Sequence, residues 1–387
     1  MGNTGSQAGR HYRAAIIGHT GAGNYGHSLD ICFNDLPGVE VVAIADPDPD
    51  GLAAGQRRSG ATTAYRDYRQ MLDKEQPDLV AIAPRFVHER VDMVTAATAH
   101  GCHIYLEKPI AATLAEADVI LKTATDAGVK IAVAYQFQMH PATVRLRELV
   151  DEGKIGKLRL VRSYGKMDHR GGVQDLAVLG THLFDMMRLF AGTARWCSAD
   201  LFAGSRLVTA DDVRSGDEGI GAVLGDGLRA CFGFDHDVLG TFESYHHLGG
   251  GDTVFGFDLV GEQGQLAHRG SFTRRLYYSP HPYAEPGIPT DRWEKIDVPS
   301  AGLHEMVGDE PPDAAAHAAL VHRANQRVVL DLLDAIENDR EPATSVQRAH
   351  AAMEMIQAVS AAHAAGGRIT LPLENRNPPY VDPGPND

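Results

Sequence analysis

The chain has 387 residues, enough for two or three domains of about 100–200 residues each. With 36 Lys and Arg against 51 Asp and Glu, its formal net charge is −15. Its densest basic runs are the pairs Arg57-Arg58 and Arg274-Arg275. Nucleic acids and anionic membrane surfaces are therefore unfavourable partners. Hydrophobic residues make up 43% and charged residues 22%, proportions that are typical of folded globular proteins and not of disordered ones.

Neither the start of the chain nor its cysteines point to export. Residues 1–10, MGNTGSQAGR, are small and polar, so we expect a flexible tail and not a secretory signal. No apolar stretch reaches the roughly 18–20 residues that cross a bilayer. The four cysteines (Cys32, Cys102, Cys197 and Cys231) are far apart, which argues against a disulfide framework or a zinc knuckle. We therefore expect a cytoplasmic protein.

The first third of the chain alternates apolar runs with amphipathic stretches. Helical patterns cover residues 66–74 and 113–127, and the second begins with Thr113 three residues before Glu116, which forms a capping box. Apolar runs typical of buried strands lie at 13–18, 39–46, 79–83, 103–106 and 129–134. This alternation predicts a parallel sheet covered by helices on both faces, a Rossmann domain over residues 11–138.

The pattern changes near residues 136–140. Helices are expected at 141–152, 181–191, 315–339 and 345–365, and strands at 195–203, 219–224, 228–235, 238–246, 254–260 and 264–269. The short spacings between these strands favour a mostly antiparallel, open sheet. We predict an α/β domain for substrate binding and oligomerisation over 139–373, an irregular excursion over 280–313, closing helices that can pack back on the first domain, and a Pro-rich tail over 374–387.

A glycine motif follows the first expected strand. Gly21-Ala22-Gly23-Asn24-Tyr25-Gly26 matches G-x-G-x-x-G, and Asp46 stands 20 residues after Gly26, at the end of the second strand. The motif is expected to open a helix whose N–H groups bind a pyrophosphate, while Asp46 accepts hydrogen bonds from ribose hydroxyls. The alternative is a plain structural turn. Because Gly18 already ends the strand, the loop is longer than the minimal form, and we include Gly18 and Thr20 in the predicted cofactor site.

The neighbourhood of Asp46 favours NAD over NADP. A carboxylate repels a 2′-phosphate, Pro47-Asp48-Pro49-Asp50 adds negative charge, and the first basic residue after Asp46 is Arg57.

The turn Glu107-Lys108-Pro109 closes the fourth expected strand, at the sheet edge where ligands of parallel sheets bind. Lys108 can be an ordinary surface lysine, but beside a dinucleotide it can also carry a proton.

Several motifs together make the chain resemble the glucose–fructose oxidoreductase, inositol dehydrogenase and MocA family (Gfo/Idh/MocA). They are the glycine motif with Asp46, the loop from Pro84 to His88, Glu107-Lys108-Pro109 and the segment Gly180-Thr181-His182-Leu183-Phe184-Asp185. The resemblance implies that Pro84, His88, Glu107 and Lys108 belong to the cofactor site. It also implies that Lys108 and His182 lie at the nicotinamide end, where they bind and deprotonate a substrate hydroxyl.

One position departs from the family pattern. Polyol dehydrogenases of this family often carry an aspartate four residues before the histidine, and Val178 stands there. Asp175 is a candidate replacement, and His182 can alternatively be a core histidine. The polar segment before it offers Lys166, Asp168, Arg170 and Asp175 to a polyhydroxylated substrate, or is simply a solvated loop.

Three functions follow as hypotheses. The first is an NAD-dependent oxidoreductase that moves hydride between a secondary hydroxyl of a sugar, sugar acid or cyclitol and the nicotinamide. The second is a redox-neutral, glycosidase- or lyase-like enzyme that uses tightly held NAD, and the third is a non-catalytic NAD-binding sensor.

No metal is expected from the sequence. In Glu243-Ser-Tyr-His246-His247, adjacent histidines on a strand point to opposite faces and cannot readily share an ion. The open sheet predicts instead a homodimer or homotetramer formed through its uncovered face.

Overall fold

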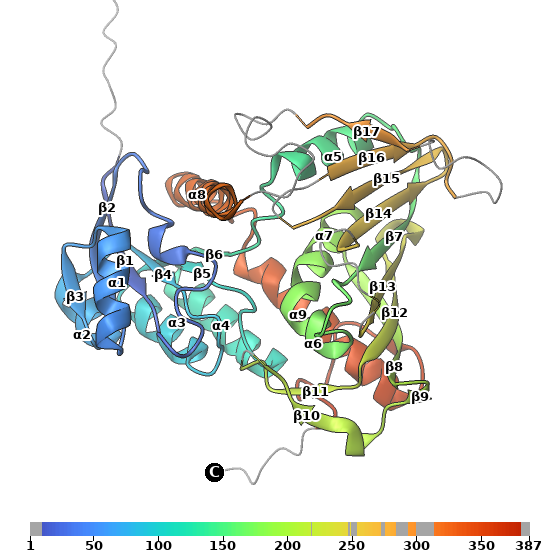
Figure 1. The fold of residues 1–387 in the computed structure, drawn as a ribbon, viewed down its shortest axis with the longest axis horizontal. Coiled ribbons are helices and arrows are strands. Elements are labelled where there is room, and N and C mark those ends of the chain that lie inside the picture. Colours follow the sequence, from blue (N-terminus) through green and yellow to red (C-terminus); the bar gives the residue numbers. More distant parts are fainter. Residues whose placement is uncertain are drawn as a thin grey trace, which may run out of the picture.

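The computed structural model describes residues 10–217, 219–246, 248, 254–271, 275–283, 293–298 and 313–380. Two sheets dominate it, one in each half of the molecule, with helices between them (Figure 1). In these described ranges no helix combines the length and apolar character that crossing a bilayer requires.

The first sheet is parallel throughout, with strand order β3-β2-β1-β4-β5-β6. Its strands are β1 (Tyr12–Ile17), β2 (Val39–Ala45), β3 (Thr63–Tyr65), β4 (Leu79–Ile82), β5 (His103–Leu106) and β6 (Ile131–Val133). This is the order of a doubly wound dinucleotide-binding domain, in which ligands bind where the order reverses, between β1 and β4. The Rossmann prediction is confirmed.

Both faces of this sheet are covered. The helices of the domain are α1 (Pro49–Ser59), α2 (Tyr68–Glu75), α3 (Arg90–Ala99) and α4 (Leu114–Ala127). The Thr113 hydroxyl accepts a hydrogen bond from Glu116 N and the Glu116 carboxylate accepts one from Thr113 N, so the predicted capping box is present. One core cluster lies under α2, α3 and α4, and the other lies under α1 and residues 25–36.

The helix expected to follow the glycines is not formed. Residues 18–36 contain turns and the 3₁₀ helix η1 (Leu29–Ile31). Asn24, Gly26 and Ser28 have φ values of 54°, 57° and 60°, in the left-handed region, which an α-helix cannot include. The prediction was wrong here because the glycine motif was taken to lead directly into a helix.

The second sheet is mixed and mostly antiparallel, as predicted, with order β17-β16-β15-β14-β7-β13-β12-β8-β18 and only β7 and β13 parallel. Its strands are β7 (Leu158–Tyr164), β8 (Ala194–Ala203), β12 (Gly227–Phe234), β13 (Leu239–Tyr245), β14 (Gly256–Gly261), β15 (Gly264–Arg269), β16 (Arg275–Ser279), β17 (Glu294–Ile296) and β18 (Ile369–Thr370). β9 (Arg206–Leu207) pairs antiparallel with the end of β8, and β10 (Val213–Ser215) pairs with β11 (Ala222–Leu224) in a separate ribbon.

Helices cover the face of the second sheet that is turned toward the first domain (Figure 1). They are α5 (Pro141–Asp151), the short α6 (Val173–Asp175), α7 (Thr181–Ala191) and α9 (Val346–Ala365), and the π-helix η2 (Leu176–Gly180) connects α6 to α7. α9 buries Ala349 and Met353 in the first domain and Met355 and Val359 in the second, so it belongs to both cores. The remaining helix, α8 (Ala314–Glu337), packs Val328 and Leu332 against the first sheet.

The structure also differs from the sequence interpretation in the second sheet. The central strand β7 was not predicted, because Arg159, Arg162 and Ser163 break its apolar pattern, yet it pairs on both sides. β17 lies in the excursion expected to be irregular, most of which falls outside the described residues. The tail over 1–10 lies almost entirely outside them as well, as does His247.

Candidate active site at the carboxyl edge of the first sheet

The glycine loop after β1 packs onto the ends of β4 and β5. Gly26 has a φ of 57°, and a Cβ atom there would lie 2.5 Å from Glu107 Oε2 and 2.6 Å from Ala83 O, so only glycine fits this approach. At Gly21, with a φ of 89°, a Cβ atom would meet nothing within 4 Å. Gly26 therefore fixes the loop on the sheet, while Gly21 leaves its backbone open to a ligand.

Most other loop residues predicted to bind the cofactor contact the protein itself. Gly18 lies against the ring of the buried Tyr25, and Gly23 lies against the main chain of Arg85. Asn24 Oδ1 accepts a hydrogen bond from Gly21 N at 3.0 Å, Tyr25 Oη donates to Gly51 O at 3.3 Å, and Ala22 is buried.

Asp46 has no exposed surface and is fully engaged within the protein. Its carboxylate accepts hydrogen bonds from Thr20 Oγ1 at 2.7 Å, from Thr20 N at 3.1 Å and from Asp48 N at 3.0 Å. Asp46 thus ties the glycine loop to the end of β2. A ribose hydroxyl that binds Asp46 has to displace or share these contacts.

A surface pocket opens beside Asp46, at the carboxyl ends of β1 and β2. It is lined by Gly18, His19, Ala45, Asp46, Pro47, Arg66, Asp67, Tyr68, Arg69, Glu89 and Met93. The guanidinium of Arg66 donates to Pro47 O, with Nη2 at 3.1 Å, and that of Arg69 lies 4.5 Å from the ring centre of Tyr68. Sequence reasoning missed both cations, because they follow β3 in the chain and only the fold brings them to β2. The lining thus carries three carboxylates, those of Asp46, Asp67 and Glu89, and two guanidinium groups, which are acceptors for ribose hydroxyls and donors for the phosphates of a dinucleotide.

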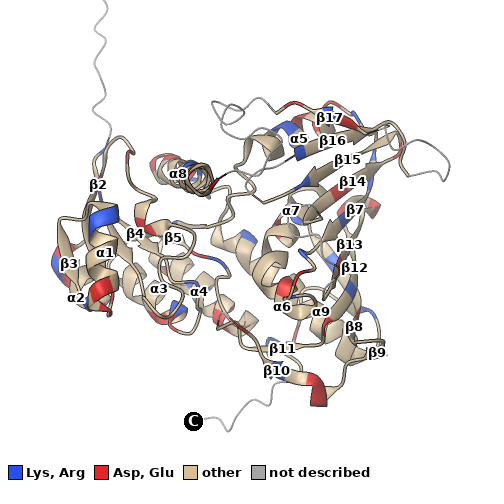
Figure 2. Ribbon diagram, in the orientation of Figure 1, with Lys and Arg blue, Asp and Glu red and all other residues tan. Residues whose placement is uncertain are grey.

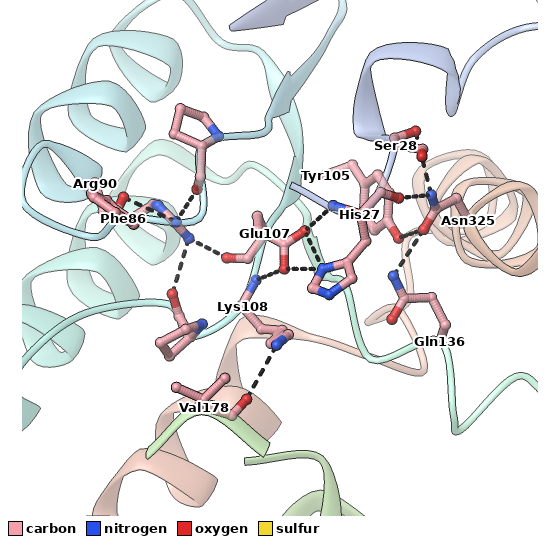
Figure 3. Close-up of polar contacts among 12 residues, drawn as sticks. His27, Ser28, Phe86, Arg90, Tyr105, Glu107, Lys108, Gln136, Val178 and Asn325 are labelled. Atoms are coloured by element: carbon pink, nitrogen blue, oxygen red, sulfur yellow. Dashed lines mark hydrogen bonds and ion pairs between the residues drawn. The ribbon is translucent and has the colours of Figure 1, made fainter. Parts of the chain in front are cut away.

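Glu107, like Asp46, is a fully buried carboxylate, and its polar contacts are drawn in Figure 3. It accepts hydrogen bonds from the ring Nδ1 of His27 at 3.0 Å, from His27 N at 3.2 Å and from Lys108 N at 3.0 Å. Burial alone would raise the pKa of Glu107, but His27 together with the charges of Lys108 and Arg90 lowers it to about 2. The carboxylate is therefore ionised and turned toward His27.

Lys108 reaches across to the second domain. Its side chain is buried, and its Nζ donates a hydrogen bond to the main-chain oxygen of Val178 at 3.1 Å (Figure 3). Val178 belongs to η2, which leads directly into α7 and His182. Single π-helical turns inside helices are frequent at functional sites, because they aim side chains and carbonyls away from the regular helical pattern.

Arg90, at the start of α3, organises the loops around Lys108. It has no exposed surface and donates to the main-chain oxygens of Pro84, Phe86, Glu107 and Pro109 (Figure 3). Burial lowers the pKa of Arg90 to about 10 while Glu107 opposes this shift, so the guanidinium remains charged at neutral pH. Sequence reasoning missed Arg90, because an arginine at the start of a helix is ordinary until its partners are known.

His182 is 5% exposed and is held by aromatic rings. Its imidazole stacks on Phe137 with centroids 4.3 Å apart and meets Tyr135 edge-on at 5.5 Å. Phe137 and Tyr135 follow β6 in the first domain, while His182 starts α7 in the second. The structure thus brings Lys108, the turn at Val178 and the ring of His182 to the junction of the two domains.

The predicted substrate residues before α7 are strongly paired. Asp175 Oδ2 accepts hydrogen bonds from Ser244 Oγ at 2.6 Å and from Met167 N at 3.2 Å, and burial raises the pKa of Asp175. Asp168 binds Arg170 at 2.5 Å. Lys166 Nζ lies 5.7 Å from the ring centre of Phe255.

His88, the last residue of the predicted Pro84 loop, is exposed, and its ring centre lies 6.0 Å from that of His19. Over the described part of the chain, acidic and basic residues are interspersed on both domains (Figure 2), in agreement with a small-molecule site.

Residues 12–135 match the model of the Gfo/Idh/MocA family, an oxidoreductase family with an NAD-binding Rossmann fold. The first domain of this chain is therefore similar to the NAD-binding domain of that family. D-apiose dehydrogenase from Paraburkholderia graminis is 27% identical over 53% of this chain and 56% of its own length. Levoglucosan dehydrogenase from Pseudarthrobacter phenanthrenivorans is 25% identical over 70% of this chain and 82% of its own length. The chain thus spans about half of the first relative and four fifths of the second.

The fold likeness extends over nearly the whole chain. A levoglucosan dehydrogenase solved with NADH and levoglucosan superposes with a TM-score of 0.71, at 19% sequence identity, over 94% of this chain and 100% of the other. The chain therefore has the same two-domain α/β fold as this solved structure.

Proposed function

We propose that this protein is an NAD-dependent dehydrogenase that moves hydride between a secondary hydroxyl of a sugar, sugar acid or cyclitol and the nicotinamide. The observation that carries the proposal is the position of Lys108. It stands at the carboxyl edge of the first sheet, buried, and is oriented by the carbonyl of Val178 from the other domain. A cation at the junction of a dinucleotide domain and a second domain suits a reaction at the hydroxyl of a small substrate.

Each residue of the site has its own role in the proposed hydride transfer. NAD, when bound, supplies the hydride acceptor. Lys108 holds the substrate oxygen and stabilises the negative charge that develops on it as the C–H bond breaks. His182, clamped against Phe137, accepts or relays the hydroxyl proton. Arg90 and Glu107 fix the turn that carries Lys108 but do not themselves touch the substrate.

The substrate class rests on the relatives and on polar residues near the junction. The relatives named above are dehydrogenases of D-apiose and of levoglucosan, both carbohydrates. In this chain, Lys166, Asp168, Arg170 and Asp175 precede His182, and a polyhydroxylated ligand that binds there has to share the contacts that Asp168 makes with Arg170 and Asp175 makes with Ser244.

The test is turnover of a panel of aldoses, sugar acids, anhydrosugars and cyclitols with NAD and with NADP, followed by absorbance of the reduced nicotinamide. We expect steady NADH formation with at least one member. Substrate consumption with copurified cofactor and no net NADH would favour the redox-neutral alternative, which the absence of a carboxylate at Val178 keeps in consideration. Dinucleotide binding without any turnover would favour a sensor.

A further inference from the structure

Three metal-ligating side chains meet at the rim of the pocket beside Asp46. His19 comes from the glycine loop after β1, and His88 and Glu89 come from the loop between β4 and α3. One ligand atom of each residue lies within 4.8 Å of the ligand atoms of the other two. Two imidazoles and a carboxylate are a donor set used by Zn²⁺ and other divalent transition metals.

The separation of His19 and Glu89 suits a shared ion, whereas His88 lies slightly farther away. Zn–N and Zn–O bonds are about 2.0–2.1 Å, so two ligand atoms on a tetrahedral ion lie about 3.3 Å apart. His19 Nδ1 and Glu89 Oε2 are 3.2 Å apart. The ring centres of two imidazoles on one ion are on the order of 5 Å apart by the same geometry, and those of His19 and His88 are 6.0 Å apart at 60°. His88 is exposed, so a change of rotamer can close this difference without moving the core.

The orientation of Glu89 is not explained by its helix. Glu89 occupies the N-cap position of α3, where an acidic side chain would normally accept a hydrogen bond from the first turn, but it makes no such bond. Its carboxylate turns to His19 instead. The side chains of His19 and Glu89 remain 25% and 44% exposed, so an ion can reach them from solvent.

We propose that His19, His88 and Glu89 form a binding site for one divalent transition-metal ion, such as Zn²⁺, on the wall of the dinucleotide pocket. The sequence alone did not indicate the site, because His19 is separated from His88 by 69 positions and no short metal motif links them. His19 and Glu89 also line the pocket that contains Asp46, so the ion lies beside the ligand that enters there. Water or an oxygen of that ligand completes the coordination shell.

The test uses the full-length, untagged chain, stripped with a chelator and free of dinucleotide and substrate. Titration with Zn²⁺ by calorimetry is expected to show one saturable site per chain, and Co²⁺ is expected to give the visible absorption of a low-coordinate complex. Because neither dinucleotide nor substrate is present, the outcome does not depend on the proposed dehydrogenase activity.

The variants His88→Ala and Glu89→Gln each remove one ligand, and each is expected to weaken Zn²⁺ binding by at least about tenfold. His100→Ala is the matched control, since His100 contacts Asp73 at 3.0 Å in a similar histidine–carboxylate pair that has no third ligand among the residues the structure describes. Circular dichroism and thermal unfolding report whether the variants are folded, and the nearly isosteric Glu89→Gln guards against a folding artefact. Absence of saturable binding, unchanged affinity in both ligand variants, or an equal loss in His100→Ala would overturn the site.

Discussion

At the scale of single residues, the arrangement of Glu107 and Lys108 explains how two adjacent opposite charges take different roles. The carboxylate of Glu107 is directed to His27, whereas the ammonium of Lys108 is directed to Val178 O (Figure 3). The side chain of Lys108 is therefore linked to the second domain, while the carboxylate of Glu107 is held by His27 within the first.

Replacing Lys108 is therefore expected to affect turnover far more than cofactor binding. Lys108→Ala should lower kcat by about 10²–10⁴-fold with a nearly unchanged NAD Kd, the range typical of a positioned proton-transfer group. His182→Ala should lower turnover as well, but less, because Val178 supplies no carboxylate to orient the imidazole. Steady-state kinetics and fluorescence titration with NAD measure the two effects. Near-normal turnover in Lys108→Ala would remove the basis of the proposed function.

Substitutions in the pocket beside Asp46 are expected to change the binding of the two cofactors in opposite ways. Asp46→Ala should weaken NAD more than NADP, because it removes the ribose acceptor and the repulsion of a 2′-phosphate together. Arg66→Ala should do the reverse, since Arg66 lines the same pocket and is a cation available to a 2′-phosphate. Calorimetric titration of both variants with both dinucleotides tests this. If wild type binds NADP more tightly than NAD, the interpretation of Asp46 is wrong.

The lowered pKa of Glu107 should make the free energy of unfolding depend on pH. The folded-state pKa is about 2 while a free glutamate titrates near about 4.3, so the ionised carboxylate stabilises the fold above about pH 4.3, and this contribution is lost as the pH falls toward 2. It amounts to a few kcal/mol at most, at roughly 1.4 kcal/mol per pKa unit.

Urea unfolding of wild type and Glu107→Gln between pH 6 and about pH 3 isolates this contribution. The stability difference between the two proteins should shrink as the pH falls. Burial raises the pKa values of Asp175 and Asp185, so these two groups change the free energy of unfolding with pH in the opposite direction. Because both proteins contain them, their contribution cancels in the difference. A difference that stays constant with pH would contradict the depressed pKa of Glu107.

At the scale of elements, α8 contributes a side chain that connects separate segments of the candidate site. Asn325 on α8 has no exposed surface, donates to His27 O at 2.8 Å and accepts from Tyr105 Oη at 2.8 Å and from Gln136 Nε2 at 2.9 Å (Figure 3). One side chain near the end of the sequence therefore joins the glycine loop, β5 and the segment after β6. This network positions His27, the partner of Glu107.

Asn325→Ala is expected to destabilise the protein by about 2–4 kcal/mol, because it leaves several buried polar groups without their partners. It should also weaken dinucleotide binding, since the glycine loop loses its anchor at His27. Asn338→Ala, at the exposed end of the same helix, is the control and should cost under about 1 kcal/mol. Urea unfolding and NAD titration give both quantities. Equal losses in the two variants would show that the network contributes nothing specific.

At the scale of the whole molecule, the second sheet has helices on one face, while its other face carries partly exposed side chains such as Leu239 on β13 and Trp196 on β8. We predict that this face joins copies of the chain as a dimer or tetramer. Light scattering at micromolar concentration should give a multiple of the monomer mass, and Leu239→Asp should shift the distribution toward the monomer. A wild-type monomer under these conditions would refute the prediction.

Much of the fold could be predicted from local pattern alone. The strands β1, β2, β4 and β5 are short apolar runs that end at glycine, aspartate or proline, and α7 was placed at residues 181–191 because its apolar face repeats with the helical period. Thr113 and Glu116 marked the start of α4 because a capping box involves only neighbouring residues. Periodicity and capping act within a few residues, so they can be recognised without knowledge of the fold.

The contacts that build the candidate site could be found only in the tertiary structure. Glu107 and His27 are 80 positions apart, Lys108 and Val178 are 70 apart, and Asn325 lies 298 positions after His27. The sequence determined that a dinucleotide domain with an Asp46 and a Glu107-Lys108-Pro109 turn exists. The fold decided that Arg66 joins Asp46, that Arg90 holds the turn, that the glycine loop enters no α-helix, and that His19 meets Glu89. The physical reason is that a folded chain places side chains by packing distant segments together, and no local pattern carries that information.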